Sequence, residues 1–467
     1  MGIGNAFNTA LSGLSAFSSK VSYISENLAN TSTVGYKSVG SSFQSYVTAS
    51  NANYNSSGGV TISPSYNNTL AGQVTTTSVG TNFAVSDGNG FIPVEVPTST
   101  TNSTASFSGS TQLYSRAGDF SVNNDGYLVN SSGQYLMGLK ETTAFSTPSG
   151  SSIPTTASLG NLTAVKIDST YLSMPAAAST TITVNDNWPA SLTSSATIPT
   201  SDTSASQVSS ELQFYDSLGT VQTLKVTYQK TADNTWNIVN ASIPSDTAAS
   251  VTIGGVTYTN GVADSDSGAQ IVFDTSGNIS SVVNGSSTLT SGNLGFDFSV
   301  SGLTDGSAGS STSTQTLTLN LGTTSTGSTQ YSGSSLSVRS SSDATGHAAG
   351  EYKSASVDSD GYVVLSYSNG MTAKAYRVPL VTFSDADELT RVSGSTFSAN
   401  DTAGSPVARW AGQGDAGTIT SSSVEASNVD TADELTAMIV AQRAYSANGK
   451  VITTCDDMLK ETLNLKQ

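Results

Sequence analysis

Few side chains in this 467-residue sequence have the types and spacing that catalysis or metal binding requires. The one histidine, His347, lies among Gly and Ala residues, and no Cys or Glu pair near it has metal-ligand spacing. A Ser-His-Asp triad would have to use this histidine, yet no Gly-x-Ser-x-Gly elbow lies between a predicted strand and a predicted helix. We interpret His347 as a solvated loop residue.

The acidic stretch 358–361 (Asp-Ser-Asp-Gly) resembles the opening of a calcium loop. The acidic ligand expected at its twelfth position is missing, because position 369 is Asn. A type I′ hairpin turn explains the Asp-Gly pair without a metal. No Gly-x-x-x-x-Gly-Lys pattern opens a helix. We therefore expect no enzyme activity, no cofactor and no metal site.

The composition argues against a nucleic-acid partner. The chain has a net charge of −17, and its 17 basic residues form no run, whereas phosphate binding needs clustered Lys and Arg. The one cysteine, Cys455, has apolar neighbours and is predicted to be a buried small residue. No apolar run predicts a membrane span, and no Sec-type signal is recognised at the N-terminus, so we expect export by another route.

The sequence predicts two terminal helices, and we expect the function of the chain to depend on them. Apolar residues recur from residue 3 to residue 28 at alternating spacings of four and three, which predicts a helix with a heptad seam. Lys20 and Glu26 are its only charges, so its polar flank is expected to meet protein or a narrow aqueous lumen. The seam consists of Ile3, Phe7, Ala10, Leu14, Phe17, Val21, Ile24 and Leu28.

The C-terminal region offers a partner for this seam. A capping-box pattern at Thr431 and Glu434 marks the start of a second helix. Its apolar residues Met438, Tyr445, Ile452 and Leu459 are seven apart, flanked by Leu435, Ile439, Cys455 and Leu463. Ordinary two-helix packing inside one globular domain is the alternative. We predict a self-assembly interface made of Ile3, Phe7, Leu11, Leu14, Phe17, Val21, Ile24, Leu28, Leu435, Met438, Ile439, Tyr445, Ile452, Leu459 and Leu463.

Between the helices the hydrophobic period changes to two, which indicates β-strands. We predict hairpins at 83–94 and 114–129, and a β-rich middle part from residue 212 onward. Residues 357–364 resemble 122–129, so the chain is expected to leave one β-domain, form another and return. The predicted fold is mainly β with terminal helices, in four nested parts: helical core 1–30 and 428–467, connector 31–71 and 396–427, inner β-domain 72–145 and 351–395, and one or two outer β-domains at 146–350.

Motifs at both ends of the chain resemble the bacterial flagellar rod and hook family. At the N-terminus these are residues 11–14 (Leu-Ser-Gly-Leu), 24–31 and 34–37, and at the C-terminus 425–430, 438–445, 450–452 and 457–459. The inserted region favours the hook branch over the shorter rod branch, through residues 215–219, Trp236, 273–277 and 367–370. Residues 40–43 and 346–350 depart from the family pattern.

The resemblance implies that many copies form a curved hollow helical tube, with the helices as its coiled-coil core. Such a tube is a universal joint that transmits motor torque to the filament, and it lies outside the cell. Its implied partners are further copies, the distal rod, hook cap and hook–filament junction proteins, and the flagellar export apparatus. The alternatives are a distal rod protein with an enlarged outer domain and a Ser/Thr-rich adhesin that binds carbohydrate. We further expect that, when the tube bends, outer domains slide against their neighbours through weak polar contacts. The helical core and the connector at 31–70 are expected to absorb the length change.

Overall fold

The computed structural model describes residues 3–51, 54–101, 104–141, 153–197, 205–247, 249–259, 262–263, 269–285, 287–303, 314–333, 337–338, 343–393 and 395–464. Strands dominate these residues and a long helix stands at each end, as the sequence predicted. The contacts divide the chain into two compact units. Unit 1 is Met1–Leu172, Tyr352–Ser366 and Thr372–Gln467, and unit 2 is Ser173–Glu351 and Tyr367–Met371.

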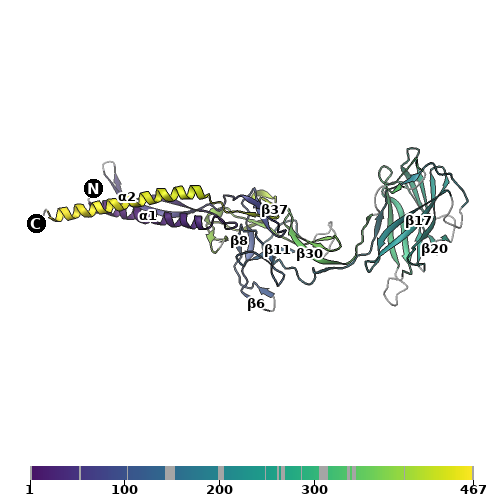
Figure 1. Ribbon diagram of the computed structural model, residues 1–467, viewed down its shortest axis with the longest axis horizontal. Coiled ribbons are helices and arrows are strands. Elements are labelled where there is room, and N and C mark those ends of the chain that lie inside the picture. The colour runs from purple at the N-terminus through teal and green to yellow at the C-terminus, as the bar shows by residue number, and fades with distance from the viewer. Residues whose placement is uncertain are drawn as a thin grey trace. The chain divides into compact units, whose positions relative to one another are not determined.

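The terminal helices α1 (Ile3–Ala29) and α2 (Thr431–Asn464) lie side by side in unit 1 (Figure 1). They are antiparallel, because Gly13 lies against Asn448 while Asn27, nearer the end of α1, bonds Glu434 near the start of α2. The predicted capping box is not formed. Asp430 caps α2 instead, because its Oδ1 accepts hydrogen bonds from the backbone amides of residues 432 and 433.

Where an extended connector was expected, the chain forms a long β-hairpin. Strands β1 (Val39–Asn51) and β2 (Tyr54–Tyr66) pair along their whole length and pack against α1. The backbone amide of Val60 donates a hydrogen bond to Ser12 Oγ over 3.2 Å, and the Phe17 and Phe43 rings are 5.4 Å apart. Gly59 has φ +125°, and a Cβ at that position would overlap Ser12 Oγ.

The β-part of unit 1 is built from both arms of the chain. Strand β3 pairs with β38, β4 with β37, β8 with β35, and β5 with β8 and β11. Strands β4 and β5 do not pair with each other, so the predicted 83–94 hairpin is wrong. The structure also places 153–172 and the strands of 396–427 in this unit.

The strands and turns of unit 1 beyond the hairpin have the following bounds: β3 (Val74–Thr76), β4 (Phe83–Ser86), β5 (Ile92–Glu95), β6 (Ser99–Thr101), β7 (Thr104–Ser106), β8 (Leu113–Ser115), β9 (Ser121–Val122), β10 (Leu128–Val129), β11 (Tyr135–Lys140), β12 (Thr163–Ala164), β30 (Gly350–Val357), β31 (Tyr362–Tyr367), β32 (Thr372–Arg377), β33 (Leu380–Thr382), η1 (Ala386–Glu388), β34 (Thr390–Arg391), β35 (Thr396–Ser398), β36 (Val407–Arg409), η2 (Gly414–Ala416), β37 (Thr418–Ser421) and β38 (Ser423–Glu425). The first two residues of β30 and the last of β31 belong to unit 2.

The two similar stretches 122–129 and 357–364 form the same turn. In each, the side chain of the first turn residue, Asn123 or Asp358, accepts two backbone hydrogen bonds, and the glycine three residues later has positive φ. Asp360 does not have positive φ, as a type I′ turn would require. The turn is therefore a type I turn followed by a glycine bulge.

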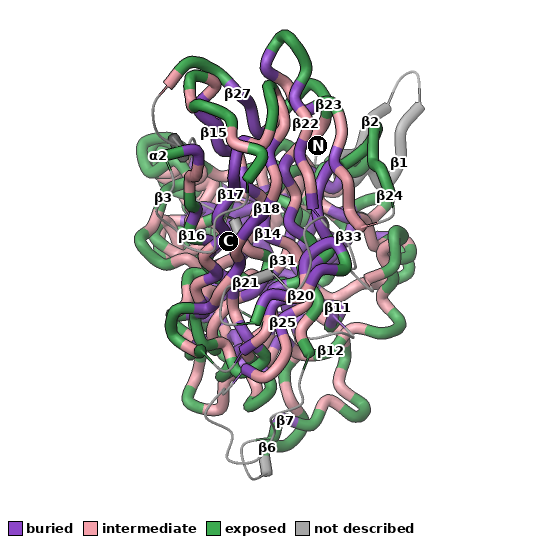
Figure 2. The backbone as a smooth tube through the Cα atoms, turned by 90° about the vertical axis from the view of Figure 1, so that its right-hand side faces the viewer, coloured by how far each residue is buried: buried purple, intermediate pink, exposed green. Residues whose placement is uncertain are grey.

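Unit 2 is a β-structure around one shared core. Trp188 and Trp236 are fully buried in this core, and buried positions, purple in Figure 2, run along β17. The strands are β13 (Ser173–Met174), β14 (Thr181–Thr183), β15 (Asp186–Pro189), β16 (Gln207–Tyr215), β17 (Val221–Ala232), β18 (Thr235–Ser242), β19 (Ser250–Ile253), β20 (Val256–Thr259), β21 (Val262–Ala263), β22 (Ala269–Phe273), β23 (Ile279–Asn284), β24 (Ser287–Leu289), β25 (Leu294–Ser301), β26 (Gln315–Gly322), β27 (Thr329–Tyr331), β28 (Ser337–Val338) and β29 (Asp343–Ala344).

The sheets of unit 2 combine neighbouring strands with distant ones. One sheet has the order β21-β20-β19-β25-β26-β14-β29, a second β16-β17-β18-β22-β23-β24, and a third β27-β15-β28. Strand β14 runs parallel to β26, and β15 parallel to β27. Parallel neighbours so far apart in sequence join the first and last parts of this unit.

Candidate self-assembly surface

The seam predicted on α1 is mostly covered within the chain, by α2 and by the β1–β2 hairpin. Its members Ala10 and Ile24 are buried, whereas Phe7, Leu14, Phe17, Val21 and Leu28 are half-buried. Leu11 differs, because 52% of its surface is exposed. The side chain of Ile3 lies outside the described residues. The structure therefore uses most of the α1 seam for contacts within one chain.

On α2 the residues that meet α1 are small. Ala441 and Cys455 are buried, and Asn448, halfway between them, is half-buried against Gly13. The burial of Cys455 confirms its predicted role as a small core residue. Small side chains bring the two helix backbones close together and leave the larger apolar residues of α2 outside the contact.

Most of the large residues predicted on α2 are exposed. Leu435, Ile439, Tyr445 and Leu459 are each between 44% and 52% exposed, whereas Met438 and Ile452 are half-buried. The side chain of Leu463 is not described. Sequence reasoning missed three further exposed apolar residues, which are Val440, Val451 and Met458. A projection of α2 at 3.6 residues per turn would have found them, because they share one side of the helix.

The exposed apolar residues form two stripes on α2. With about 100° per residue, Leu435 and Ile439 lie on one side of the line through Ala441, Asn448 and Cys455. Val440, Val451 and Met458 lie on the other side of that line. We call these two sets the first and the second stripe. A helix with apolar residues on both sides of its internal contact has more apolar surface than its own chain covers.

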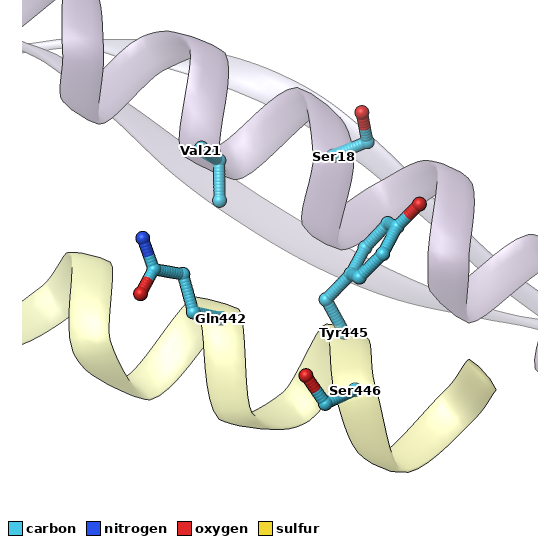
Figure 3. Close-up of a pocket in the computed structure, with 5 residues that line it drawn as sticks. All are labelled: Ser18, Val21, Gln442, Tyr445 and Ser446. Atoms are coloured by element: carbon cyan, nitrogen blue, oxygen red, sulfur yellow. The ribbon is translucent and has the colours of Figure 1, made fainter. Parts of the chain in front are cut away.

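A groove runs between the two helices beside the first stripe. Ser18 and Val21 of α1 face Gln442, Tyr445 and Ser446 of α2 across a space of about 460 Å³ (Figure 3). The side chains of Gln442 and Tyr445 point from α2 toward α1 in that view. The groove has the mixed polar and apolar lining of a helix-packing surface.

At the end of the helices near the β-part, three charged side chains are fully buried together. Glu425 Oε1 is 2.6 Å from Lys37 Nζ, and Glu425 Oε2 is 3.5 Å from Arg116 Nη1. Glu425 Oε1 also accepts a hydrogen bond from the Gly72 amide over 2.7 Å. We call Lys37, Arg116 and Glu425 the charged triad. Burial lowers the pKa of Lys37 and of Arg116, and the charge of Glu425 opposes both shifts.

Polar side chains extend the triad toward both helices. Asn27 Nδ2 donates hydrogen bonds to Glu434 Oε1 over 2.7 Å and to the Val39 carbonyl over 2.9 Å. Asn428 Oδ1 accepts a hydrogen bond from the Ser38 amide over 2.7 Å. The family-like motifs at the two ends of the chain therefore meet here and bind each other. The sequence identifies these motifs but does not predict that they are in contact, because the partners are hundreds of residues apart.

The remaining sequence candidates show no site chemistry. His347 is half-buried in a β-bridge with Ala177, and its Nδ1 is 3.0 Å from the Ala348 carbonyl oxygen. Asp358 uses its carboxylate for the turn described above. Over the described residues, no group of three or more His, Cys, Asp and Glu could hold a metal ion. In the same part of the chain no helix is long and apolar enough to cross a membrane.

Four family descriptions match successive parts of the chain. Residues 7–37 match "Flagella basal body rod protein", and 85–187 match "Flagellar hook protein FlgE/F/G D1 domain". Residues 187–347 match "Flagellar basal body protein FlaE D2 domain", and 420–465 match "Flagellar basal body rod FlgEFG protein C-terminal". The first and last matches contain the motifs that meet at the charged triad.

Full-length relatives support these matches. The flagellar hook protein FlgE of Rhizobium meliloti is 31% identical over 100% of both chains. That of Brucella abortus is 33% identical over 100% of both chains, and that of Salmonella typhimurium is 26% identical over 99% of this chain and 100% of its own. A crystal structure of Helicobacter pylori flagellar hook protein FlgE2 aligns with 75% of this chain, with 13% identity and a TM-score of 0.45, too low to carry an argument.

Proposed function

Because the chain belongs to the flagellar hook protein family, as its full-length identity to named hook proteins shows, we propose that its terminal helices are the surface through which copies polymerise. The chain is a structural subunit of the bacterial flagellar hook. The observation that carries the proposal is the pair of apolar stripes that α2 leaves exposed on both sides of its contact with α1. Two stripes on one helix fit two neighbouring copies, as a closed tube requires.

The exposed apolar side chains of the helices provide a driving force for assembly. Fully burying a large apolar side chain contributes about 1.5–3 kcal/mol, and these side chains are about half exposed, so each gains about 1 kcal/mol on contact. The five stripe residues with Leu11, Tyr445 and Leu459 then supply about 8 kcal/mol per copy before the cost of association. Repeated along a helical polymer, contacts of this strength hold many copies together.

The exposure of the predicted interface residues divides them into those that contact other copies and those that pair the two helices. We assign Leu11, Leu435, Ile439, Tyr445 and Leu459 to contacts between copies, because they are exposed. The half-buried residues of α1 (Phe7, Leu14, Phe17, Val21, Leu28) and of α2 (Met438, Ile452) line the helix pair and contribute their outer edges. Ile24 supports the pair from inside. Ile3 and Leu463 stay in the proposal on sequence grounds alone.

The proposed polymer is a curved hollow tube outside the cell that bends while it transmits torque. The family membership supports contacts at its ends with the distal rod, hook cap and hook–filament junction proteins, and passage of the chain through the flagellar export apparatus. The alternatives of a rod protein with an enlarged outer domain and of a carbohydrate-binding adhesin are not favoured, because the full-length relatives are hook proteins.

Bending was expected to use sliding outer domains and a connector at 31–70 that changes length. The second part of this hypothesis changes with the structure, because β1 and β2 are fully paired and bound to α1. We keep the first part and propose that weak polar contacts between unit 2 of neighbouring copies allow the sliding. Disulfide locks between neighbouring outer domains should stiffen the tube, and unchanged bending and motility would count against this mechanism.

The polymerisation surface is tested by placing a charge in each stripe. Ile439→Asp and Val451→Asp should each prevent polymer formation, since a carboxylate cannot be buried between apolar helices without a partner. Thr436→Asp is the matched control, because it adds the same charge at an exposed position of the same helix, between the outer edges of the two stripes and opposite the contact with α1. Sedimentation and electron microscopy measure assembly. Normal polymers from both stripe variants would refute the proposal.

A further inference from the structure

The heptad contact between α1 and α2 does not by itself determine how the two helices are aligned. The α2 side of the contact is a row of small residues, with Ala441, Asn448 and Cys455 seven apart. A displacement of α1 by seven residues would place its apolar residues over the next set of small ones. Because a periodic seam of this kind tolerates such a shift at little cost, something else must select the alignment.

One polar contact between the helices selects a single alignment in the structure. Asn27 Nδ2 is 2.7 Å from Glu434 Oε1, and Gly13 of α1 lies beside Asn448 of α2 in the same register. Fourteen residues separate the two α1 positions and the two α2 positions alike. Asn27 is itself buried, and its Oδ1 accepts a hydrogen bond from the Val39 amide over 2.9 Å. A shift of α1 along α2 would break the Asn27–Glu434 bond.

The charged triad holds the chain on both sides of this contact. Lys37 lies eight residues after α1, Glu425 lies six residues before α2, and Arg116 comes from the β-part between them. Lys37 Nζ also donates a hydrogen bond to the Leu70 carbonyl over 2.6 Å, and the Gly35 amide donates to the Glu425 carbonyl over 2.8 Å. The segments that lead out of α1 and into α2 are thereby bound to each other.

The triad is a poor choice for stability alone. It buries two cations with one anion, and Arg116 Nε has no hydrogen-bond partner among the described atoms. Apolar side chains of similar volume commonly replace buried ion clusters without loss of stability, whereas buried polar groups are best attested as determinants of register. Its position at the base of a periodic helix pair fits that second role.

We propose that the charged triad, with the Asn27–Glu434 bond, is a register-determining site that aligns α1 on α2 and so places the two apolar stripes for neighbouring copies. This inference rests on the proposed polymerisation through α2. Without the site, α1 moves seven residues toward the C-terminal end of α2, about 10 Å at 1.5 Å per residue. Neighbouring copies would then meet α1 at a position displaced along α2 from the one that matches the first stripe.

The native thiol of Cys455 reports the alignment directly. Ala6 lies seven residues before Gly13, and Cys455 seven residues after Asn448, so Ala6→Cys faces Cys455 in the observed register. Gly13→Cys faces Cys455 only after the seven-residue shift. Under mild oxidation of the full-length chain, before and after assembly, mass spectrometry of linked peptides counts the intrachain disulfide of each reporter. In the otherwise unchanged chain, Ala6→Cys should link and Gly13→Cys should not.

The triad is then altered in two ways within each reporter. Glu425→Gln removes the anion, and the triple variant Lys37→Met, Arg116→Met, Glu425→Leu replaces the whole triad by apolar side chains that keep the chain folded. Glu388→Gln is the control, because it removes one carboxylate charge at an exposed site of the same unit. We expect at least a fivefold rise in the Gly13→Cys disulfide in either triad variant and no change in the control.

The outcomes separate the inference from the proposed function. A Gly13→Cys disulfide that stays at background in both triad variants, while Ala6→Cys still links, overturns the register-determining role. Loss of polymer that accompanies the shifted disulfide supports it. If the unaltered chain forms no polymer at all, the proposed function fails, whatever the disulfides show.

Discussion

The buried carboxyl of Asp186 makes unit 2 less stable at neutral pH than in mild acid. Asp186 is 1% exposed, its Oδ2 accepts a hydrogen bond from Ser210 Oγ over 3.2 Å, and its Oδ1 has no hydrogen-bond partner among the atoms that the structure describes. Burial raises its pKa from 3.8 to about 6, although the Ser210 bond opposes the shift. The charged form is therefore the unfavourable one inside the folded unit.

The sign and size of the effect follow from this shift. A group whose folded pKa is raised binds its proton more tightly in the folded state, so its stabilising effect is complete below about pH 4 and is lost as the pH rises through 6. A shift of about two pKa units corresponds to about 3 kcal/mol. Asp186→Asn removes the charge, so at pH 7.5 the variant should be more stable than the original chain by up to about 3 kcal/mol.

Denaturant unfolding at pH 4 and pH 7.5 measures this difference. Fluorescence of Trp188 and Trp236 follows unit 2, since both are fully buried there. Asp297→Asn is the control, because it removes the charge of an exposed carboxylate in the same unit. The two chains should differ little at pH 4. A variant that is no more stable than the original chain at pH 7.5 would refute the reasoning about the buried carboxyl.

Three further predictions concern other parts of the chain. Gly35 has φ +66° and lies against the backbone of residues 116 and 117, so Gly35→Ala should lower the unfolding free energy of unit 1 by about 2 kcal/mol or more in denaturant titrations. Trp236→Ala should cost unit 2 about 3–5 kcal/mol in the same assay and leave the helix contacts unchanged. Amide exchange in a dilute monomer should show weaker protection of residues 3–28 than in the polymer, because neighbouring copies cover the half-buried seam only on assembly; equal protection in both states would contradict this.

The terminal helices were predictable because their signal is local. The seam at 3–28 predicted α1, observed at Ile3–Ala29, and the start of α2 at Thr431 was placed correctly. The cap was displaced by one residue to Asp430, since Glu434 bonds Asn27 in place of its own backbone. Such exchanges depend on a distant partner, which a local pattern cannot show.

The strand pairings were harder to predict, for the same reason. Residues 87–90 looked like a hairpin turn, but Gly88 and Gly90 instead pack against the backbone of residues 416 and 417, more than 300 positions away. Strand β4 consequently pairs with β37. The hairpin β1–β2 was hidden by its Ser, Asn and Gly content, which resembles a linker.

Heptad spacing alone could not divide the predicted interface into residues that pair the two helices and residues that are exposed. Heptad spacing found Leu435 and Ile439, yet it treated all seam residues alike and missed Val440, Val451 and Met458. Exposure separates residues that pair the two helices from those left for other copies. The charged triad has no sequence signal beyond three charged residues in separate motifs. It can therefore be identified only from the folded structure.

Electron microscopy of the purified full-length chain beside a chain that lacks residues 1–30 and 428–467 tests the central claim most directly. The full-length chain should assemble into hollow tubes, and the shortened chain, with both helices removed, should stay unassembled at every concentration at which the full chain polymerises. Tubes of the same diameter from the shortened chain would show that the helices are not the polymerisation surface.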